Sequence, residues 1–360
     1  MAAASARAPT VRKVRRFPVR RAIQWALGVA VGAFAVVGAF KTLSLGTFSG
    51  NAWRDLVVFG IAQGAIYAMI ALGYTMVYGV LRMINFAHGE VFMFGAFASF
   101  FVARPLKESG FMDANPFVSA LLLMAVAMIG AIVVAVILER VAYRPLRNAP
   151  RLVPLITAIG ASLFLQSTAA GFFGAQARGY PRPDVLGGTW TIAGVPILRS
   201  QAIVIVVAFV SMMVLSLFVS RTRTGRSIRA VAEDKGIASL MGIDVDRVIV
   251  KTFVIGGLLA GIAAVLYAMV FELVAPTMGF VPGIKAFTAA VVGGIGSIAG
   301  AALGGLVLGL LESVGPSLFL TGYGIPGPNQ LRDVIAFAIL VFVLIFRPGG
   351  ILGSGEAEKV

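Results

Sequence analysis

Residues 56–80 read LVVFGIAQGAIYAMIALGYTMVYGV and contain no charged side chain. A helix needs about 17–25 mostly apolar residues to cross ~30 Å of hydrocarbon, so this stretch is long enough to span a membrane. Similar apolar stretches follow along the chain, at about 22–40, 84–104, 117–138, 153–175, 201–220, 250–272, 283–296, 298–316 and 331–347. The pattern predicts an all-α, polytopic membrane protein with about ten transmembrane helices.

The composition agrees with this fold class. The chain of 360 residues is 59% hydrophobic and 12% charged, with a mean hydropathy of +0.95. It contains 43 glycines, a residue that lets membrane helices approach closely. The net charge of +15 lies in particular loops, so it does not indicate nucleic-acid binding. The absence of cysteine excludes disulfides, thiolate metal sites and cysteine nucleophiles.

The loops alternate between rich and poor in Arg and Lys. If the basic tail 1–21 is cytoplasmic, ten crossings also place residue 82, the loops 139–152 and 221–249, and 347–360 with its tail 351–360 inside. Most of the 30 Lys and Arg residues then lie in the cytoplasm, as the positive-inside rule requires. We therefore predict a transmembrane domain over 22–350 that contains the cytoplasmic loop 221–249.

The N-terminal stretch allows three interpretations. Residues 1–21 are rich in Arg and free of acidic residues, which is typical of a transit peptide. Together with 22–40 they could instead form an uncleaved membrane anchor or a long signal peptide. Cleavage after the first apolar segment would leave the orientation of the other nine crossings unchanged.

The longest cytoplasmic connection, 221–249, reads RTRTGRSIRAVAEDKGIASLMGIDVDRVI. Its residues predict a helix from about Ser227 to Met241, and Gly242 is a typical C-terminal stop signal. One interpretation is a solvated connector helix. The other is a helix that lies against a cytoplasmic partner.

Several polar side chains lie inside the apolar segments, where a charged group costs about 3 kcal/mol and usually faces a cavity or a partner. The candidate pathway residues are Gln63, Tyr67, Asn85, His88, Glu90 and Glu312. The His88-x-Glu90 spacing does not indicate zinc, because the chain has no cysteine and no second histidine. On a continuous helix His88 and Glu90 also point to different faces. Alternatively, both residues lie near the cytoplasmic interface.

Residues 291–309, VVGGIGSIAGAALGGLVLG, repeat glycine at every fourth position through Gly296, Gly300 and Gly304. Small residues at this spacing allow close packing of helix backbones. Segment 283–296 is also short and interrupted by glycine, as are the broken helices of transport pathways. We predict close helix packing here, and a broken helix is compatible with it.

The sequence contains a weak internal match. GAIYAM at 64–69 resembles AVLYAM at 264–269, and the two segments cross the membrane in opposite directions in the predicted topology. The match suggests an inverted repeat of four helices, which is typical of transporters.

No motif for an energy-yielding reaction is present. The chain has no G-x-x-x-x-G-K-[ST] sequence for ATP phosphates and no H-E-x-x-H metalloprotease motif. We therefore expect a transport protein rather than an enzyme, driven by an ion gradient or by a separate ATPase.

Several long stretches resemble one known family in the same order. GIAQGAIYAMIALGYTMVYGVLRMINFAHGEVFMFGAF (60–97), ERVAYRPLRNAPRLVPLITAIGASLFLQ (139–166), the 221–249 loop and GIKAFTAAVVGGIGSIAGAALGGLVLG (283–309) are similar to the permease subunits of branched-chain amino acid ABC importers. The resemblance runs from about residue 53 to 360 and is closer to the shorter of the two permease types. Residues 1–52 look like an extension beyond the shortest members.

The resemblance implies a multi-pass protein of the bacterial inner membrane that assembles with a second permease, two cytoplasmic ATPases and a periplasmic binding protein. The ATPases would bind ATP, and the chain would need no cofactor or metal. The loop 224–243 would be the coupling helix, with Arg226, Arg229, Glu233, Asp234, Ala238 and Gly242 as candidate coupling residues. We expect import of branched-chain amino acids. The alternatives are a permease for urea, short amides or other amino acids, and an ion-coupled transporter or channel.

Overall fold

The computed structural model describes residues 19–147, 149–150, 152–192, 194–347 and 349–353. Most of the predicted tails 1–21 and 351–360 lies outside these ranges. The structure confirms the all-α fold class, because thirteen α-helices account for most of the described chain. The helices are α1 (Val19–Leu45), α2 (Gly50–Leu81), α3 (His88–Glu108), α4 (Phe111–Ala114), α5 (Pro116–Leu138), α6 (Leu152–Phe173), α7 (Arg199–Arg221), α8 (Arg223–Glu233), α9 (Lys235–Leu240), α10 (Val245–Phe271), α11 (Phe280–Gly293), α12 (Ile298–Gly315) and α13 (Arg332–Phe346).

Nine helices within these ranges are long and apolar enough to cross a membrane. The remaining predicted crossing, 283–296, is different, because α11 has only 14 residues. At 1.5 Å per residue it is about 21 Å long, which is short of a ~30 Å hydrocarbon layer. The chain therefore makes this crossing with a short helix and an irregular segment before it, rather than with a tenth full-length helix.

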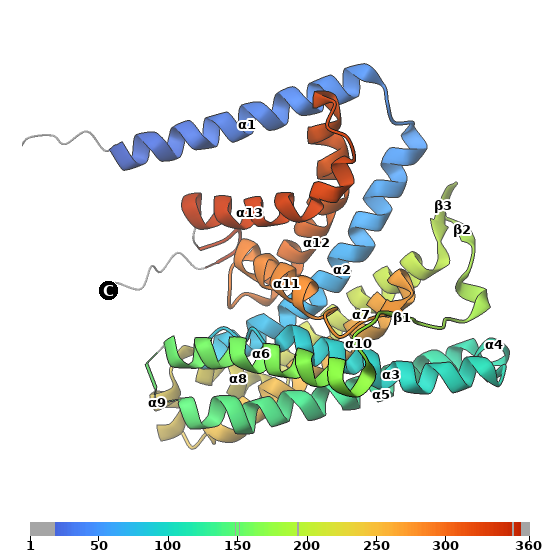
Figure 1. Ribbon diagram of the computed structural model, residues 1–360. Helices are drawn as coiled ribbons and strands as arrows, with labels where there is room; N and C mark the ends of the chain where they lie inside the picture. The colour runs from blue at the N-terminus through green and yellow to red at the C-terminus, as the bar shows by residue number, and fades with distance from the viewer. Residues whose placement is uncertain (1–18, 148, 151, 193, 348, 354–360) are drawn as a thin grey trace, which may run out of the picture.

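The loops gather at two opposite ends of the bundle (Figure 1). One end carries α8, α9 and the last described residues, and we call it the α8–α9 end. The other end carries α4 and the antiparallel hairpin of β2 (Thr189–Ile192) and β3 (Val195–Leu198), and we call it the hairpin end. There β1 (Arg178–Gly179) also pairs with β4 (Leu273–Val274). The grouping agrees with the predicted topology, in which the basic loops are cytoplasmic.

The two halves of the bundle share an order of elements. α2 and α10 both end at a non-glycine residue in the left-handed region, Arg82 and Glu272, each with φ of 55°. In each half an irregular segment follows, and the next helix, α3 or α11, then begins. In each half the following long helix, α5 or α12, leads into a π-helical turn and a 3-10 turn, at 139–146 and at 316–323. This common order supports the predicted inverted repeat.

The direction of the repeat follows from the positions of the helix ends. Arg82 contacts the end of α8, whereas Glu272 forms an ion pair with Arg182 at the hairpin end. α2 and α10 therefore run in opposite directions. The short sequence match pairs Gly64 with Ala264, while the helix ends pair Arg82 with Glu272. The structural repeat consequently has a different register from the match that suggested it.

Glycines bring α12 against α2 and α11. A Cβ added at Gly300 or Gly304 would collide with the backbone of α11, at Gly293 and Ala289 respectively. Gly296 differs, because it lies in the turn between α11 and α12 with φ of +96° and open space around it. Its glycine is required by the backbone conformation rather than by helix packing, contrary to our expectation.

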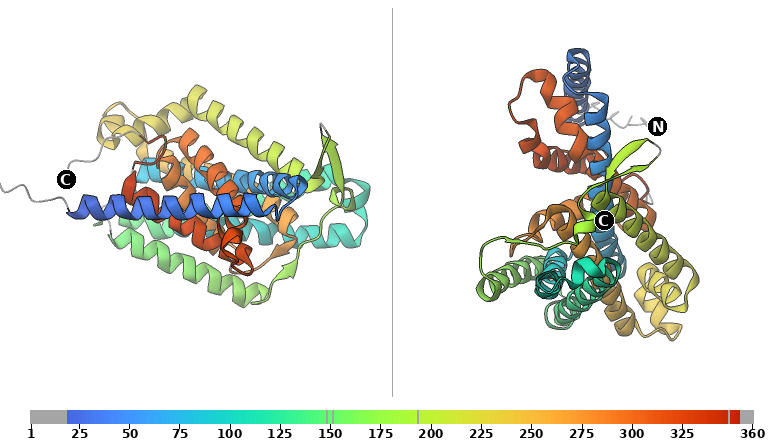
Figure 2. Two further views of the ribbon diagram at one scale, coloured as in Figure 1. Left: turned by 90° about the horizontal axis from the view of Figure 1, so that it is seen from above. Right: turned by 90° about the vertical axis from the view of Figure 1, so that its right-hand side faces the viewer.

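Helices α1 and α13 lie beside each other at the periphery of the bundle (Figure 2). α1 packs mainly against the 316–323 turns, where Gly322 N–H donates a hydrogen bond to the Thr42 hydroxyl at 2.8 Å. α2, α3 and α10 form the buried centre instead, with side chains such as Ile66, Phe92 and Leu266 fully buried. Polar residues on these central helices are therefore the ones removed from both lipid and water.

Candidate functional site

Helices α3 and α11 begin at the same place inside the bundle, and their first turns touch. A Cβ added at Gly283 would lie 3.0 Å from the Cα of Gly89. A Cβ at Gly89 or Gly279 would collide with the backbone of the other residue. The first N–H groups of a helix give its N-terminus a partial positive charge. Two such helix ends therefore meet at this junction, and glycine permits the close contact.

Glu90 is the acidic residue at the junction. It lies in the first turn of α3 and is completely buried. Its Oε1 accepts hydrogen bonds from Ser162 Oγ at 3.0 Å and from Gln166 Nε2 at 2.9 Å, both on α6. Its Oε2 has no hydrogen-bond partner within the part of the chain that the structure describes. The helix ends favour the carboxylate and offset part of the cost of burying it.

The other two candidates near α3 point to different neighbours. The His88 ring packs edge-on against Tyr74, with the ring centroids 4.8 Å apart. Asn85 lies before α3 begins, and its Oδ1 accepts a hydrogen bond from the Tyr143 hydroxyl at 2.7 Å. Both residues are buried within the bundle.

A second polar cluster joins α2, α11, α12 and α13. Glu312 Oε1 accepts hydrogen bonds from Lys285 Nζ at 2.6 Å and from Gln63 Nε2 at 3.0 Å. The Tyr67 hydroxyl donates to the same oxygen at 3.3 Å. Lys285 also forms an ion pair with Asp333 at 2.6 Å. The side chains of Lys285 and Glu312 are only 5% and 1% exposed, so their opposite charges compensate each other inside the membrane region.

The six pathway candidates thus fall into two clusters. Three of them surround the start of α3, and three belong to the cluster around Lys285. Each cluster also uses polar residues that our candidate set omitted, namely Lys285, Asp333, Tyr143, Ser162 and Gln166. In the sequence, the signal for such a residue is a polar side chain within an apolar segment. The sequence could not show which of them share a contact.

The loop at the α8–α9 end contains two helices where we expected one. Thr222 begins α8 by accepting a backbone N–H bond at 3.0 Å, and Asp234 begins α9 by accepting the Ile237 N–H at 2.9 Å. Short polar side chains at these positions are typical helix N-caps. Gly242 follows α9 with φ of +80°, a conformation that favours glycine. The predicted single helix is therefore broken at Asp234.

The exposed surface of this loop is apolar at its tip. We expected Ala238 to face a partner, but it is only 3% exposed and packs into the core of its own chain. Ile237, Leu240 and Met241 are 62%, 88% and 77% exposed. An apolar group on an exposed loop is typical of a contact surface. We call these three residues the loop tip.

The other predicted coupling residues lie on the surface beside the loop tip. Arg226, Arg229, Glu233 and Asp234 are all exposed. Arg229 donates a hydrogen bond to the Ser220 carbonyl at 3.3 Å, which ties α8 back to the end of α7. In the isolated chain these four side chains are therefore accessible for contact with a partner.

Charged contacts fix the loop to the membrane helices. The Arg82 guanidinium donates to two carbonyl oxygens at the C-terminal end of α8, at 3.2 and 3.3 Å. A cation is favourable at that end of a helix. Arg147 forms ion pairs with the buried Glu139 after α5 and with Asp246 at the start of α10. Partial burial, together with the charges of Arg147 and Arg82, lowers the pKa of Lys235 on α9.

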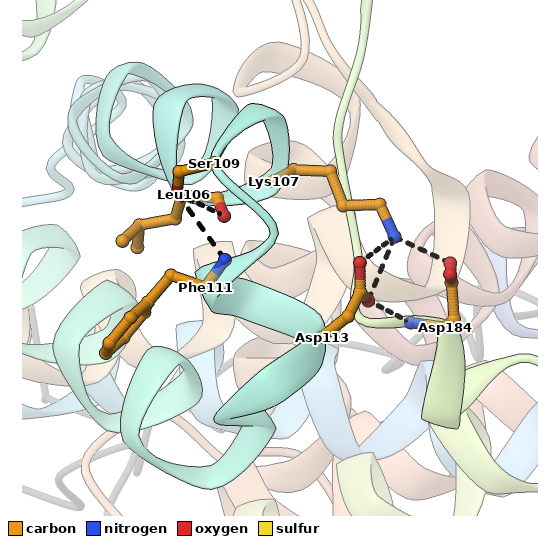
Figure 3. A network of polar contacts seen from close by, with 6 residues as sticks. All are labelled: Leu106, Lys107, Ser109, Phe111, Asp113 and Asp184. Carbon is orange, nitrogen blue, oxygen red and sulfur yellow. Dashed lines mark hydrogen bonds and ion pairs between the residues drawn. The ribbon is translucent and has the colours of Figure 1, made fainter.

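A polar network orders the hairpin end (Figure 3). The Lys107 ammonium lies between two carboxylates, 2.8 Å from Asp113 and 2.6 Å from Asp184. The Asp184 N–H also donates to Asp113 at 2.8 Å. The hydrogen bond from Lys107, followed by the one from Asp184, lowers the pKa of Asp113 below its ordinary value of 3.8. The network joins the end of α3, the short α4 and the long loop before α7.

The chain has two inverted halves, with helices that begin inside the bundle and buried charges that are compensated. This architecture is typical of a membrane transport protein. The chain belongs to the family described as branched-chain amino acid transport system / permease component, whose model matches residues 56–344. It is a multi-pass membrane permease.

Proteins of known name support this assignment. The chain is 45% identical over 310 residues to the high-affinity branched-chain amino acid transport system permease LivH of Escherichia coli, covering 84% of this chain and 96% of that protein. It is 46% identical over 313 residues to the corresponding permease BraD of Pseudomonas aeruginosa, covering 84% and 97%. A probable LivH permease of Methanocaldococcus jannaschii is 30% identical over 315 residues, covering 83% and 94%.

One solved structure, described as PsaBC from Streptococcus pneumoniae in complex with Fab, is also similar. The TM-score is 0.38 and the sequence identity is 14%, covering 86% of this chain and 96% of that chain. A likeness of this size does not bear on function.

Proposed function

We propose that this chain is the permease subunit of an ATP-driven importer in the bacterial inner membrane, which moves branched-chain amino acids into the cytoplasm. The observation that carries the proposal is its 45% identity, over 84% of its length, to a permease named for branched-chain amino acid transport. Its partners are a second permease, two cytoplasmic ATPases and a periplasmic binding protein. ATP binds to the ATPases, and this chain needs no cofactor of its own.

The loop tip supports an ATPase contact at the α8–α9 end. Ile237, Leu240 and Met241 expose apolar surface at the α8–α9 end, where a partner subunit would cover it. The loop is also attached to the membrane helices through Arg82 and Arg147. A movement of the ATPases would therefore reach α2, α5 and α10 directly, which is the requirement for coupling ATP hydrolysis to transport.

The inverted halves support alternating access. In this mechanism the pathway opens to one side of the membrane at a time, as the two halves of an inverted repeat move against each other. The junction of Gly89 with Gly279 joins the halves at the start of α3 and α11. In the proposed assembly the pathway lies at the interface with the second permease.

The test is uptake by the complete complex reconstituted in vesicles. We expect inward transport of radiolabelled leucine that requires ATP and loaded binding protein. Unlabelled isoleucine or valine should compete, and urea should not. Uptake of urea without uptake of leucine would contradict the proposed substrate.

The chain alone provides the control for the other class of mechanism. In vesicles without ATPases it should move no leucine, whether or not a sodium or proton gradient is imposed. Gradient-driven uptake by the isolated chain would identify an ion-coupled transporter and overturn the ATP-driven mechanism.

A further inference from the structure

Glu90 is a buried carboxylate, and among the described residues one of its two oxygens is hydrogen-bonded. Oε1 accepts hydrogen bonds from Ser162 and Gln166, while Oε2 has no partner among the described residues. No Lys or Arg of the described ranges forms an ion pair with it. A buried carboxylate without a cation is costly, and its unpaired oxygen is a suitable acceptor for a positively charged donor.

The surroundings of Glu90 favour its negative charge without neutralising it. Glu90 lies in the first turn of α3, and a Cβ added at Gly279, the residue before α11, would lie 2.8 Å from its Oε2. Two positive helix ends therefore stabilise the carboxylate. They supply partial charges only, so the free oxygen is available to a positively charged donor.

The other half of the bundle provides the contrast. Lys285 on α11 contacts α13 through Asp333, as Glu90 on α3 contacts α6 through Ser162 and Gln166. Lys285 has two full counter-charges, Glu312 and Asp333, each at 2.6 Å. The ionic group on α11 is thus satisfied within the chain. Glu90 on α3 has no such counter-charge within the part of the chain that the structure describes.

Access to Glu90 depends on α6. This helix is covered on one side only, with Leu163 and Phe164 exposed and Ser162 buried toward Glu90. Gln166 is partly exposed beside them. An outward displacement of α6 would break the two hydrogen bonds to Oε1, separate Phe173 from the Phe97 ring on which it stacks, and expose the carboxylate. In the described conformation the junction is closed, because the backbones of Gly89 and Gly279 touch.

We propose that Glu90, held by Ser162 and Gln166 at the junction of α3 and α11, receives the α-ammonium group of the amino acid during its passage. The inference rests on the proposed import function and names the part of the substrate that this chain contacts. The ammonium donates to Oε2 while α6 is displaced, and the return of α6 restores the bonds to Oε1.

Two matched variants separate the charge of Glu90 from its packing. Glu90→Gln keeps the shape and an oxygen that accepts from Ser162 and Gln166, but it removes the charge. Glu90→Asp keeps the charge and shortens the side chain. In the complete complex, loss of a hydrogen bond to a charged group should lower leucine uptake per ATP hydrolysed by roughly tenfold or more in Glu90→Gln. Glu90→Asp should retain more uptake than Glu90→Gln.

The outcomes are distinguishable. Wild-type complex that fails to import leucine would reject the proposed function itself. If wild type imports leucine and Glu90→Gln equals it in uptake per ATP, Glu90 does not contact the substrate. If Glu90→Asp is more defective than Glu90→Gln, the side chain has a packing role, and the proposal also fails.

A second measurement uses the unaltered protein, so it does not depend on the folding of a variant. Dicyclohexylcarbodiimide modifies carboxyl groups inside membranes, and peptide mapping reports the modified residue. In the complete complex with ATP, modification of Glu90 should be slower when the binding protein carries leucine than when leucine is absent. Glu312, which is engaged with Lys285, serves as the internal control and should not respond. Equal modification of Glu90 with and without leucine would overturn the proposal.

Discussion

Replacement of Lys285 by Met should destabilise the protein strongly. Met preserves most of the side-chain volume, but it removes the cation that lies 2.6 Å from both Glu312 and Asp333. Glu312, whose side chain is 1% exposed, would keep only the neutral donors Gln63 and Tyr67. Removing one partner of a buried pair typically costs about 3–5 kcal/mol. We expect a value near the lower limit, about 3 kcal/mol, because these two donors remain.

Two further variants test the reasoning behind this magnitude. Glu312→Gln leaves Lys285 paired with Asp333, so it should destabilise less, by about 1–2 kcal/mol, the scale of a lost charged hydrogen bond. The double variant Lys285→Met with Glu312→Met removes both buried charges. It should be more stable than Lys285→Met alone, because no unpaired charge then remains in the core.

The assay is unfolding of the purified protein in mixed micelles by a titration with sodium dodecyl sulfate, followed by circular dichroism. The matched control is Lys107→Met at the hairpin end, where the ion pairs are exposed and contribute little. The reasoning is refuted if Lys285→Met is no more destabilising than this control. The same conclusion follows if the double variant is no more stable than Lys285→Met alone.

Three further predictions concern packing, coupling and pH. Gly309→Leu should reduce the amount of folded protein in the membrane, because its side chain would meet the Gly64 backbone, whereas Gly160→Leu has nothing within 4 Å and should not; quantitative immunoblots compare them. Gly242→Val forces a β-branched residue to φ of +80°, a strain of about 1–2 kcal/mol. The Gly242→Val variant should insert into the membrane normally, but loaded binding protein should stimulate ATP hydrolysis less in its complex. Unchanged stimulation would rule out a coupling role for this turn. The pKa of Asp113 is lower in the folded protein than its ordinary value of 3.8. The stability that Asp113 contributes is therefore complete above pH 3.8, and it is lost as the pH falls through the lower pKa of the folded state. Hydrogen exchange of residues 109–115 should therefore accelerate only in that acidic range, and acceleration between pH 7 and 5 would contradict the assignment.

The sequence by itself determined the fold class and the family, and it predicted the sidedness of the loops. Crossing a membrane requires long apolar helices, and this requirement leaves a local signal such as residues 56–80. The positive-inside rule is similarly local, because it depends only on which loop carries each Arg or Lys. The Gly242 turn was also predictable, since a single residue type matches a single backbone conformation.

Other features required knowledge of which segments touch. The sequence counted 283–296 as one of the ten crossings. In the structure the chain before Phe280 is not helical as it enters the bundle, so α11 is short. Ala238 looked like a partner-facing residue, because a small side chain suits either a close partner or a packed core. Only the position of α9 against the membrane helices showed that it faces the core.

The polar clusters were decided by tertiary structure alone. The sequence predicted that Glu90 and Glu312 lie in apolar segments, but it gave no means of pairing them. Glu312 meets Lys285 through the packing of α12 on α11, and Glu90 meets Gln166 through the position of α6 beside α3. An ionic or hydrogen-bonded pair is a contact between distant residues, so its partners depend on the arrangement of helices and not on the residues nearby in the chain. The same arrangement leaves one Glu90 oxygen without a partner among the described residues, whereas it gives Glu312 a cation.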